Sequence, residues 1–198
     1  LASVGKVERR NAHPFLHGRW CFVHNGTVRN FVRHQAEVEA LIRPDLRAHI
    51  HGTTDTERCF YLFLTQLAKL QSLDGPACVE KVACALAETM GMVSSLTDMP
   101  GQDRSSMNFL VTNGDVMVAT RRNRTLFLSD TAPETGRRPH RAHGGPPKAG
   151  TQLEQFVLAS EQLSGEDHWH LIDEDNIVGV DNQLVLHRWN VRDLCTQP

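Results

Sequence analysis

Apolar residues recur at helical spacing in the first half of this chain of 198 residues. Two long segments, residues 54–70 and 78–93, each place their apolar side chains on one stripe of a helix. Thr54 and Glu57 fit a capping box at the start of the first segment, with threonine as the N-cap and glutamate three residues on. We therefore predict two amphipathic helices, whose buried stripes are Phe60, Phe63, Leu64, Leu67 and Leu70 in the first and Val79, Val82, Ala83, Leu86 and Met90 in the second.

From residue 107 onward apolar and polar residues alternate, which is the period of a half-buried strand. Short segments with this period are separated by Gly, Asn and Asp turns, and they span residues 107–121, 125–129, 155–160, 168–172, 176–180 and 183–189. The first segment contains Asn113-Gly114, which predicts a two-residue hairpin loop. Helices followed by a run of antiparallel strands indicate a layered α+β domain, with the strands between residues 107 and 189 forming most of one sheet.

Residues 131–150 interrupt this pattern. They hold four of the nine prolines and four of the fourteen glycines, and they contain no Val, Ile, Leu, Met or aromatic residue. Such a segment cannot bury enough apolar surface to offset the entropy lost on ordering. We predict a flexible, solvated insertion between two strands of a single domain that spans residues 1–198, with a basic docking loop as the alternative.

The overall composition narrows the function classes. Hydrophobic residues make up 40% of the chain and the net charge is −2, so no basic field is present to hold nucleic acid or an anionic membrane. No apolar run is long enough to span a bilayer, and no signal peptide is visible. The five cysteines form no CxxC pair. We expect reduced thiols and a cytoplasmic protein.

The eleven histidines raise the question of a metal site. In a strand, residues i and i+2 share a face, so the histidine pairs in "HIH" (49–51) and "HWH" (168–170) could each chelate an ion. Neither pair has a further His or a carboxylate at a characteristic ligand spacing. We therefore predict no metal site.

The stretch "WCFVHNGTVRNF", residues 20–31, carries the most informative ambiguity. Asn25-Gly26 is a common hairpin loop, because both residues tolerate positive φ. Downstream, however, residues 30–44 carry a helical stripe ending at Pro44, with Phe31, Val38, Leu41 and Ile42 as its apolar members. A strand that runs through Asn-Gly towards a helix is not a hairpin. Local pattern alone leaves two interpretations open, a tight turn or an asparagine that contacts a substrate.

Three motifs in a fixed order decide between them. "LASVG" at residues 1–5, "NAHPF" with "HNG" between residues 11 and 26, and "GTTDTE" at residues 52–57 together resemble the class II glutamine amidotransferases, which are N-terminal-nucleophile hydrolases. Within that group the chain is most similar to stand-alone amidotransferase-like γ-glutamyl hydrolases. The resemblance implies a four-layer αββα sandwich, here lacking its first strands, and a partial glutamine amidotransferase type-2 domain.

The resemblance also implies a site. The side-chain amide of Asn25 and the backbone N–H of Gly26 would form the oxyanion hole, where fixed donors supply much of the rate of amide hydrolysis. Asp55 would bind the α-ammonium group of glutamine or of a γ-glutamyl compound, and Ser3 its α-carboxylate. His13 and His24 match the family pattern as structural residues. The chemistry needs no cofactor, and the sequence identifies no protein partner.

The chain departs from the family at its start. The family nucleophile is an N-terminal cysteine whose own α-amine serves as base, and an arginine grips the α-carboxylate; both are expected upstream of Leu1. Internal Cys21 and Cys59 lack a free α-amine. Val4 stands where sugar-aminating relatives have histidine, which disfavours that branch. We predict an amidohydrolase whose residues 1–198 are inactive alone. The alternative is a non-catalytic, degenerate relative that acts as a ligand-binding module.

Overall fold

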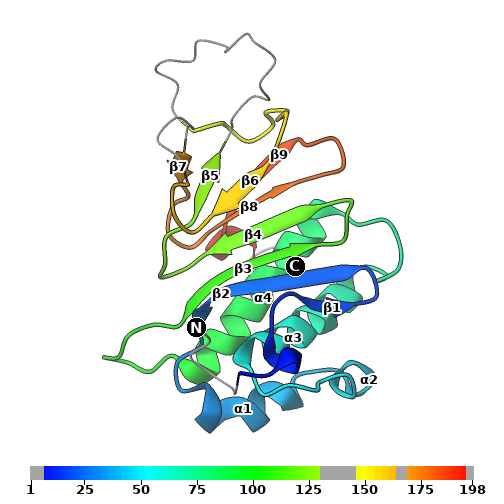
Figure 1. Cartoon of the computed structure of the whole chain (residues 1–198), viewed down its shortest axis with the longest axis vertical. Coiled ribbons are helices and arrows are strands. Elements are labelled where there is room, and N and C mark those ends of the chain that lie inside the picture. Colours follow the sequence, from blue (N-terminus) through cyan, green and yellow to red (C-terminus); the bar gives the residue numbers. More distant parts are fainter. Residues whose placement is uncertain (1–6, 130–145, 164–168, 195–198) are drawn as a thin grey trace.

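The computed structural model describes residues 7–129, 146–163 and 169–194, and these residues stack in layers (Figure 1). The central layer is a six-stranded antiparallel sheet in the order β1-β2-β3-β4-β8-β9. Its strands are β1 (Phe15–His17), β2 (Trp20–Thr27), β3 (Ser106–Thr112), β4 (Met117–Arg121), β8 (Asn176–Val180) and β9 (Leu186–Asn190). A smaller antiparallel sheet, in the order β6-β5-β7, is built from β5 (Phe127–Ser129), β6 (Val157–Ala159) and β7 (Trp169–Leu171).

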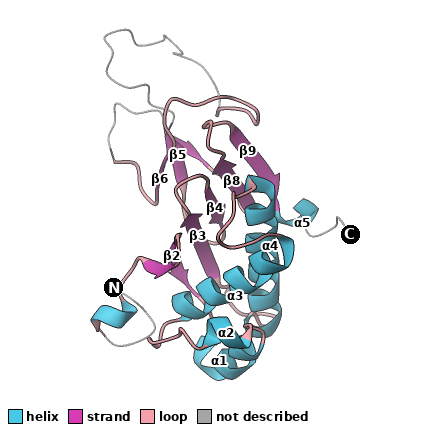
Figure 2. Cartoon of the chain, turned by 90° about the vertical axis from the view of Figure 1, so that its right-hand side faces the viewer, coloured by secondary structure: helices cyan, strands magenta, loops and turns pink. Residues whose placement is uncertain are grey.

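Helices cover one face of the six-stranded sheet, as Figure 2 shows. The long helices α3 (Asp55–Leu70) and α4 (Val79–Thr97) pack on the sheet, and α1 (Phe31–Ala40) packs on both of them. The short elements are η1 (Arg9–Asn11), α2 (Pro44–Arg47) and α5 (Val191–Leu194). The two predicted long helices are confirmed, and the predicted N-cap is too, since the Thr54 hydroxyl accepts the backbone N–H of Glu57 at 3.3 Å.

The main core lies between the helices and the six-stranded sheet. Alternate residues of β2 point into it: Trp20, Phe22 and His24 are buried, and the Phe22 ring stacks on Phe60 of α3 with centroids 5.3 Å apart. This alternation is what a strand with one buried face requires. It sends Asn25, the next residue along, to the face of the sheet away from the helices.

A second core lies between the two sheets. Its buried members are Ala119, Leu126, Leu128, Leu153, Ile172, Val178, Val180 and Leu186. The small sheet therefore packs on the half of the large sheet formed by β4, β8 and β9. The buried residues of β2 belong instead to the main core on the helix side. Among the described residues the order is helix, sheet, sheet, which supplies three layers of the predicted sandwich and confirms an α+β fold with antiparallel sheets.

Four local predictions need correction. Leu70 is 37% exposed rather than buried, because α3 ends at this residue. Leu41 is 40% exposed rather than buried, because α1 ends at Ala40 before its stripe can continue. Pro44 begins α2 at its first position, where a missing N–H costs nothing. The loop that joins β3 to β4 has four residues rather than two, since Thr112 pairs with Met117. In that loop the Asn113 side-chain oxygen accepts two backbone N–H groups and only Gly114 has positive φ.

Two further predictions concern membrane-spanning helices and the insertion at residues 131–150. Among the described residues, none of the helices combines the length and apolar character needed to cross a bilayer. Most of the predicted insertion, residues 131–145, lies outside the described residues, so its flexibility stays a prediction. At the insertion's end, the Gly150 N–H donates to the carbonyl of Leu186 at 2.7 Å.

Candidate active site

The separate sequence motifs meet at the start of α3. The Asn11 side chain donates to the Thr53 hydroxyl at 3.1 Å and accepts the Thr53 N–H at 2.8 Å. One carboxylate oxygen of Asp55 accepts the N–H of Val28 at 2.9 Å, just after "HNGT". "NAHPF", "HNG" and "GTTDTE", which lie more than 40 residues apart at their extremes, therefore form one constellation.

Strand β2 runs through Asn25-Gly26, as the strand interpretation predicted, and these residues form no turn. Strand β2 pairs with β3, where Asn25 lies opposite Asn108 and Gly26 lies opposite Met107. On its other side β2 pairs with β1 only over residues 20–22, so residues 23–27 have an uncovered edge in the described part of the chain.

The Gly26 N–H points to that uncovered edge. Backbone groups of an antiparallel strand alternate between its two neighbours. The N–H groups of Met107 and Phe109 face β4, where they bond the carbonyl of Arg122 and the hydroxyl of Thr120. The backbone N–H and C=O groups of Asn108 therefore face β2 and pair with those of Asn25. The backbone groups of Gly26, the next residue on β2, face away from β3. A main-chain donor is thus directed outward from an otherwise paired sheet.

Only glycine fits at position 26. A Cβ atom there would lie less than 3.0 Å from the carbonyl oxygen of Ser106 and from the ring of His24. The carbonyl belongs to the backbone of the neighbouring strand, so it cannot move aside like a flexible side chain. Glycine is required here because there is no space for a Cβ atom on the helix side of β2. Its backbone conformation does not require it, since its φ is not positive.

His24 supports Gly26 from the helix side. Its Nε2–H donates to the Ser106 carbonyl at 2.9 Å, and its Nδ1 lies 3.1 Å from the Thr56 hydroxyl, which donates to it in the neutral ring. The side chain is buried, and burial lowers its pKa below the usual range, against the opposing effect of the nearby Asp55 carboxylate. A neutral imidazole therefore ties β2 to α3 and to β3.

The stability of the domain is expected to fall as the pH drops below about 6.5, and His24 supplies part of this loss. Because its pKa is lower in the folded than in the unfolded chain, the unfolded state binds more protons between the two values. The free energy of unfolding then decreases with falling pH, by up to about 1.4 kcal/mol per pH unit for this one proton. Thermal unfolding between about pH 7.5 and 5 measures the effect.

The matched variants are His24→Gln and His51→Gln, because the side chain of His51 is exposed. His24→Gln should be less stable than the wild type at neutral pH but should lose less stability on acidification. His51→Gln should keep the wild-type dependence. Equal pH dependence in all three proteins would show that His24 does not contribute.

Asp55 is the first residue of α3 and is only 5% exposed. Besides the bond from Val28, its second oxygen accepts the N–H of Thr56 at 2.8 Å. A carboxylate at a helix N-terminus is favoured by the helix dipole. The aspartate is therefore held rigidly beside the β2 edge.

Sequence reasoning missed how Glu57 and Arg58 act. The Glu57 carboxylate does not close the capping box; it accepts the N–H groups of His51 and Gly52 at 2.9 and 2.7 Å. The buried Arg58 donates to the Gly52 carbonyl at 2.7 Å and to Glu39 of α1 at 2.9 Å. Together they fix the loop that leads into Asp55. Glu57 and Arg58 precede the apolar stripe, which begins at Phe60, so the periodicity of the sequence did not indicate their burial.

One predicted site residue cannot be placed. Ser3 lies outside the described residues. The internal thiols are poorly suited as nucleophiles, because burial raises the pKa of Cys21 and raises that of Cys59 well above the usual range. Cys21 also precedes Asn25 by four residues on the same strand, which separates them by about 13 Å.

The remaining chemistry-bearing groups lie elsewhere. Within the described ranges no three His, Cys, Asp or Glu side chains gather as a metal site. His49 of "HIH" instead packs edge-on against the ring of His17, with centroids 4.9 Å apart. A shallow hollow lined in part by Thr112, Asp115 and Phe156 lies at the far end of β2 from Asn25, because Thr112 pairs with Cys21.

Comparison with known proteins identifies the family. The family of class II glutamine amidotransferases matches residues 1–187, so the chain belongs to that family.

Two curated relatives carry the same description. The probable glutamine amidotransferase DUG3 of Saccharomyces cerevisiae is 30% identical over 129 residues, 61% of this chain and 36% of its own length. A putative glutamine amidotransferase of Haemophilus influenzae is 27% identical over 130 residues, 60% of this chain and 35% of its own. The matched part of the chain spans about a third of the length of both relatives.

Solved structures show the fold. A glutamine aminotransferase class-II domain protein from Silicibacter pomeroyi superposes with a TM-score of 0.63 at 19% identity, over 92% of this chain and 72% of its own. Glutamine phosphoribosylpyrophosphate amidotransferase from Bacillus subtilis gives 0.58 at 12% identity, over 94% of this chain and 33% of its own. The fold is that of the N-terminal-nucleophile amidotransferases, as predicted.

Proposed function

We propose that this domain binds glutamine or a γ-glutamyl amide and stabilises the oxyanion formed when the amide is cleaved. The observation that carries the proposal is the β2 edge: Asn25 is exposed on it, and the Gly26 N–H is directed outward beside it. Two fixed donors that can converge on one oxygen are what a tetrahedral intermediate of acyl transfer requires.

The spacing along this edge suits a γ-glutamyl group. Val28, whose N–H donates to the Asp55 carboxylate, follows Gly26 by two residues, which is about 7 Å of extended chain. The α-nitrogen of glutamine lies four bonds, about 5 Å, from its amide carbon. A substrate with its carbonyl at Gly26 therefore brings its ammonium group towards Asp55. Ser3 is proposed to bind the α-carboxylate.

The attacking group is proposed to be a cysteine thiol preceding Leu1, together with an arginine that grips the carboxylate. The raised pKa values of Cys21 and Cys59 support an external nucleophile over an internal one. The sulfur adds to the δ-carbonyl carbon, the carbonyl electrons move onto oxygen, and the donors at Asn25 and Gly26 stabilise that charge. The α-amine of the cysteine takes the thiol proton and gives it to the leaving nitrogen. The C–N bond then breaks, ammonia or an amine departs, and the thioester that remains is cleaved by water or an acceptor.

Two finer points belong to the same proposal. The γ-glutamyl hydrolase branch is favoured over sugar amination by Val4, and the amine half of the substrate is left open. A cytoplasmic location is supported by Cys21, Cys59 and Cys78, which form no disulfide.

The test compares residues 1–198 with a longer protein that restores the upstream cysteine and arginine. We expect release of ammonia or glutamate from glutamine and γ-glutamyl dipeptides by the longer protein, and none by residues 1–198, because oxyanion stabilisation without a nucleophile leaves only a small residual acceleration. Turnover by residues 1–198 would mean that the nucleophile lies within them. Tight binding without turnover by the longer protein would favour the ligand-binding module instead.

A further inference from the structure

The strand that carries Asn25 and Gly26 is anchored just beyond them by a buried serine. The N–H of Arg29 donates to the Ser105 hydroxyl oxygen at 3.0 Å. The Ser105 side chain is completely buried, and both its N–H and its hydroxyl donate to one carboxylate oxygen of Asp98. The direction of the Ser105 hydroxyl, and so the position of its acceptor oxygen beneath Arg29, is set by Asp98.

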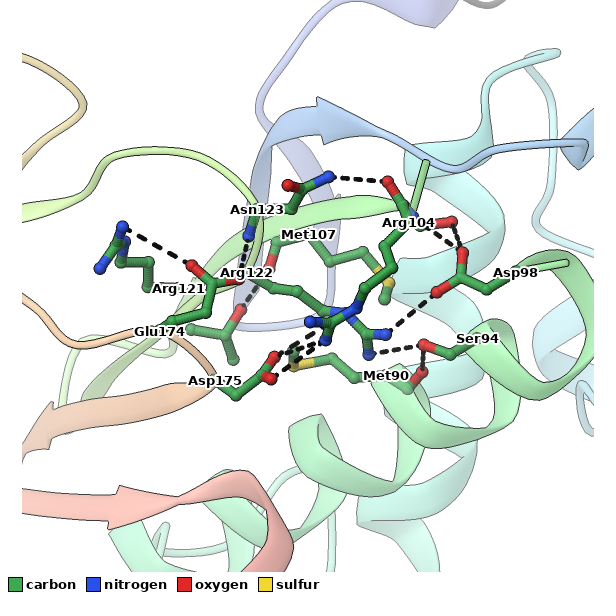
Figure 3. Close-up of polar contacts among 12 residues, drawn as sticks. Met90, Ser94, Asp98, Arg104, Met107, Arg121, Arg122, Asn123, Glu174 and Asp175 are labelled. Atoms are coloured by element: carbon green, nitrogen blue, oxygen red, sulfur yellow. Dashed lines mark hydrogen bonds and ion pairs between the residues drawn. The ribbon is translucent and has the colours of Figure 1, made fainter. Parts of the chain in front are cut away.

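Asp98 is in turn held by Arg122 at the end of β4. Figure 3 shows the Arg122 guanidinium between Asp98 and Ser94 on one side and Asp175 on the other. It donates to the second oxygen of Asp98 at 3.0 Å and to the Ser94 hydroxyl at 2.6 Å, and its Nε lies 3.9 Å from Asp175. The Arg122 side chain is only 12% exposed, so these charge-assisted contacts are weakly screened by solvent.

The backbone of Arg122 also contacts β3, the strand that pairs with β2. Its N–H donates to the Asn108 side-chain oxygen at 2.8 Å, and its carbonyl accepts the N–H of Met107 at 3.0 Å. Asn108 and Met107 are the residues of β3 that pair with Asn25 and Gly26 of β2. Arg122 thus fixes both the strand beside the two donors and the anchor beyond them.

We propose that Arg122 is a positioning residue for the oxyanion hole, acting through Asp98 and Ser105; this inference rests on the proposed function. Removing the guanidinium leaves the Asp98 carboxylate partly buried without its countercharge, which favours its rotation towards water. Ser105 then loses its fixed orientation, and the end of β2 is free to shift. A misplacement of about 1 Å at a reacting centre can cost about 10²-fold in rate.

The variants are Arg122→Met, Arg122→Lys and, as the matched control, Arg104→Met in the full-length protein. Arg104 bonds the same Asp175 through two contacts of 3.0 Å, but its side chain is half-exposed and acts on Asp175 rather than on Asp98. All variants are compared at a temperature at which thermal unfolding shows them folded. Two quantities are measured: steady-state kcat and KM for glutamine, and hydrogen exchange of the amides of residues 28–30.

For Arg122→Met we expect kcat to fall about 10- to 100-fold with KM within about twofold, and faster exchange of residues 28–30. Arg122→Lys keeps the charge and should recover part of both. Arg104→Met should match the wild type. Because Arg122 acts through the donors, its effect should shrink in an Asn25→Ala background, whereas a loss of folded protein alone would be unchanged there.

The outcomes separate the two proposals. If Asn25→Ala lowers kcat but Arg122→Met does not, or the two losses multiply fully, the positioning role is wrong and the proposed function stands. Unchanged exchange at residues 28–30 in Arg122→Met also overturns the positioning role. If Asn25→Ala itself leaves kcat unchanged, the oxyanion hole and the inference built on it both fail.

Discussion

In the full-length enzyme, Asn25→Ala is expected to lower kcat for glutamine hydrolysis about 10²- to 10³-fold with little change in KM. In the proposed oxyanion hole the side-chain amide would donate to an oxygen that gains its negative charge only as the tetrahedral intermediate forms, so its loss would affect the barrier more than substrate binding. Asn25 is exposed on β2 and contributes nothing to the main core. Steady-state kinetics with glutamine and a γ-glutamyl dipeptide measure the effect.

Asp55→Asn provides the contrasting variant. It keeps one carbonyl oxygen to accept the Val28 N–H and removes the charge that would attract the substrate ammonium group. KM should therefore rise more than kcat falls. An unchanged kcat in Asn25→Ala would assign "HNG" a purely structural role, and equal kinetic signatures in the two variants would contradict the separate roles proposed for them.

Gly26→Ala is expected to lower the free energy of unfolding by about 3 kcal/mol or more, as measured by urea denaturation. The added methyl group would be driven against the Ser106 carbonyl and the His24 ring. Since both belong to packed elements, β2 must move away from β3, and the register that pairs Gly26 with Met107 would be strained. Any variant that remains folded should also be inactive, because the same N–H is displaced.

Gly91→Ala is the matched control for this substitution. Gly91 lies within α4, and a Cβ atom there would meet nothing within 4 Å. Alanine is the better helix former by about 1 kcal/mol, so this variant should be slightly more stable than the wild type. Similar losses of stability at both positions would mean that close packing at Gly26 is not the cause.

The sequence predicted those features that depend on local pattern. Apolar spacing located α3 and α4, and the alternation after residue 107 located the seven strands from β3 to β9. The continuation of β2 through Asn25-Gly26 followed from the helical stripe beyond it, since a hairpin would have required a second strand there. Chain order and motif chemistry then identified the family, which the comparison confirmed.

The features that it missed depend on contacts between distant segments. Arg58 and Arg122 look like ordinary surface charges in the sequence, yet Arg58 is buried and Arg122 is largely enclosed, each in a network that joins several elements. Leu41 was assigned to the core because spacing alone does not show where α1 ends. Burial of a charge is decided by which partners the fold brings to it, and single-sequence periodicity carries no information about those partners.

The division into two cores has a consequence for how this protein can change. The chain between Ser129 and Val157 joins β5 to β6, two strands of the small sheet, while Asn25 and Asp55 lie on β2 and α3, the elements that pack together in the main core. Lengthening such a connection costs little, because loop-closure entropy grows only by about 0.6 kcal/mol for each doubling of its length. Insertions there would disturb the small sheet, whose strands have three residues each, before they affect the edge of β2 that carries Asn25. Evolution can therefore vary the length of this connection, apart from the part around Leu153 that packs in the second core, while β2 and α3 stay constrained.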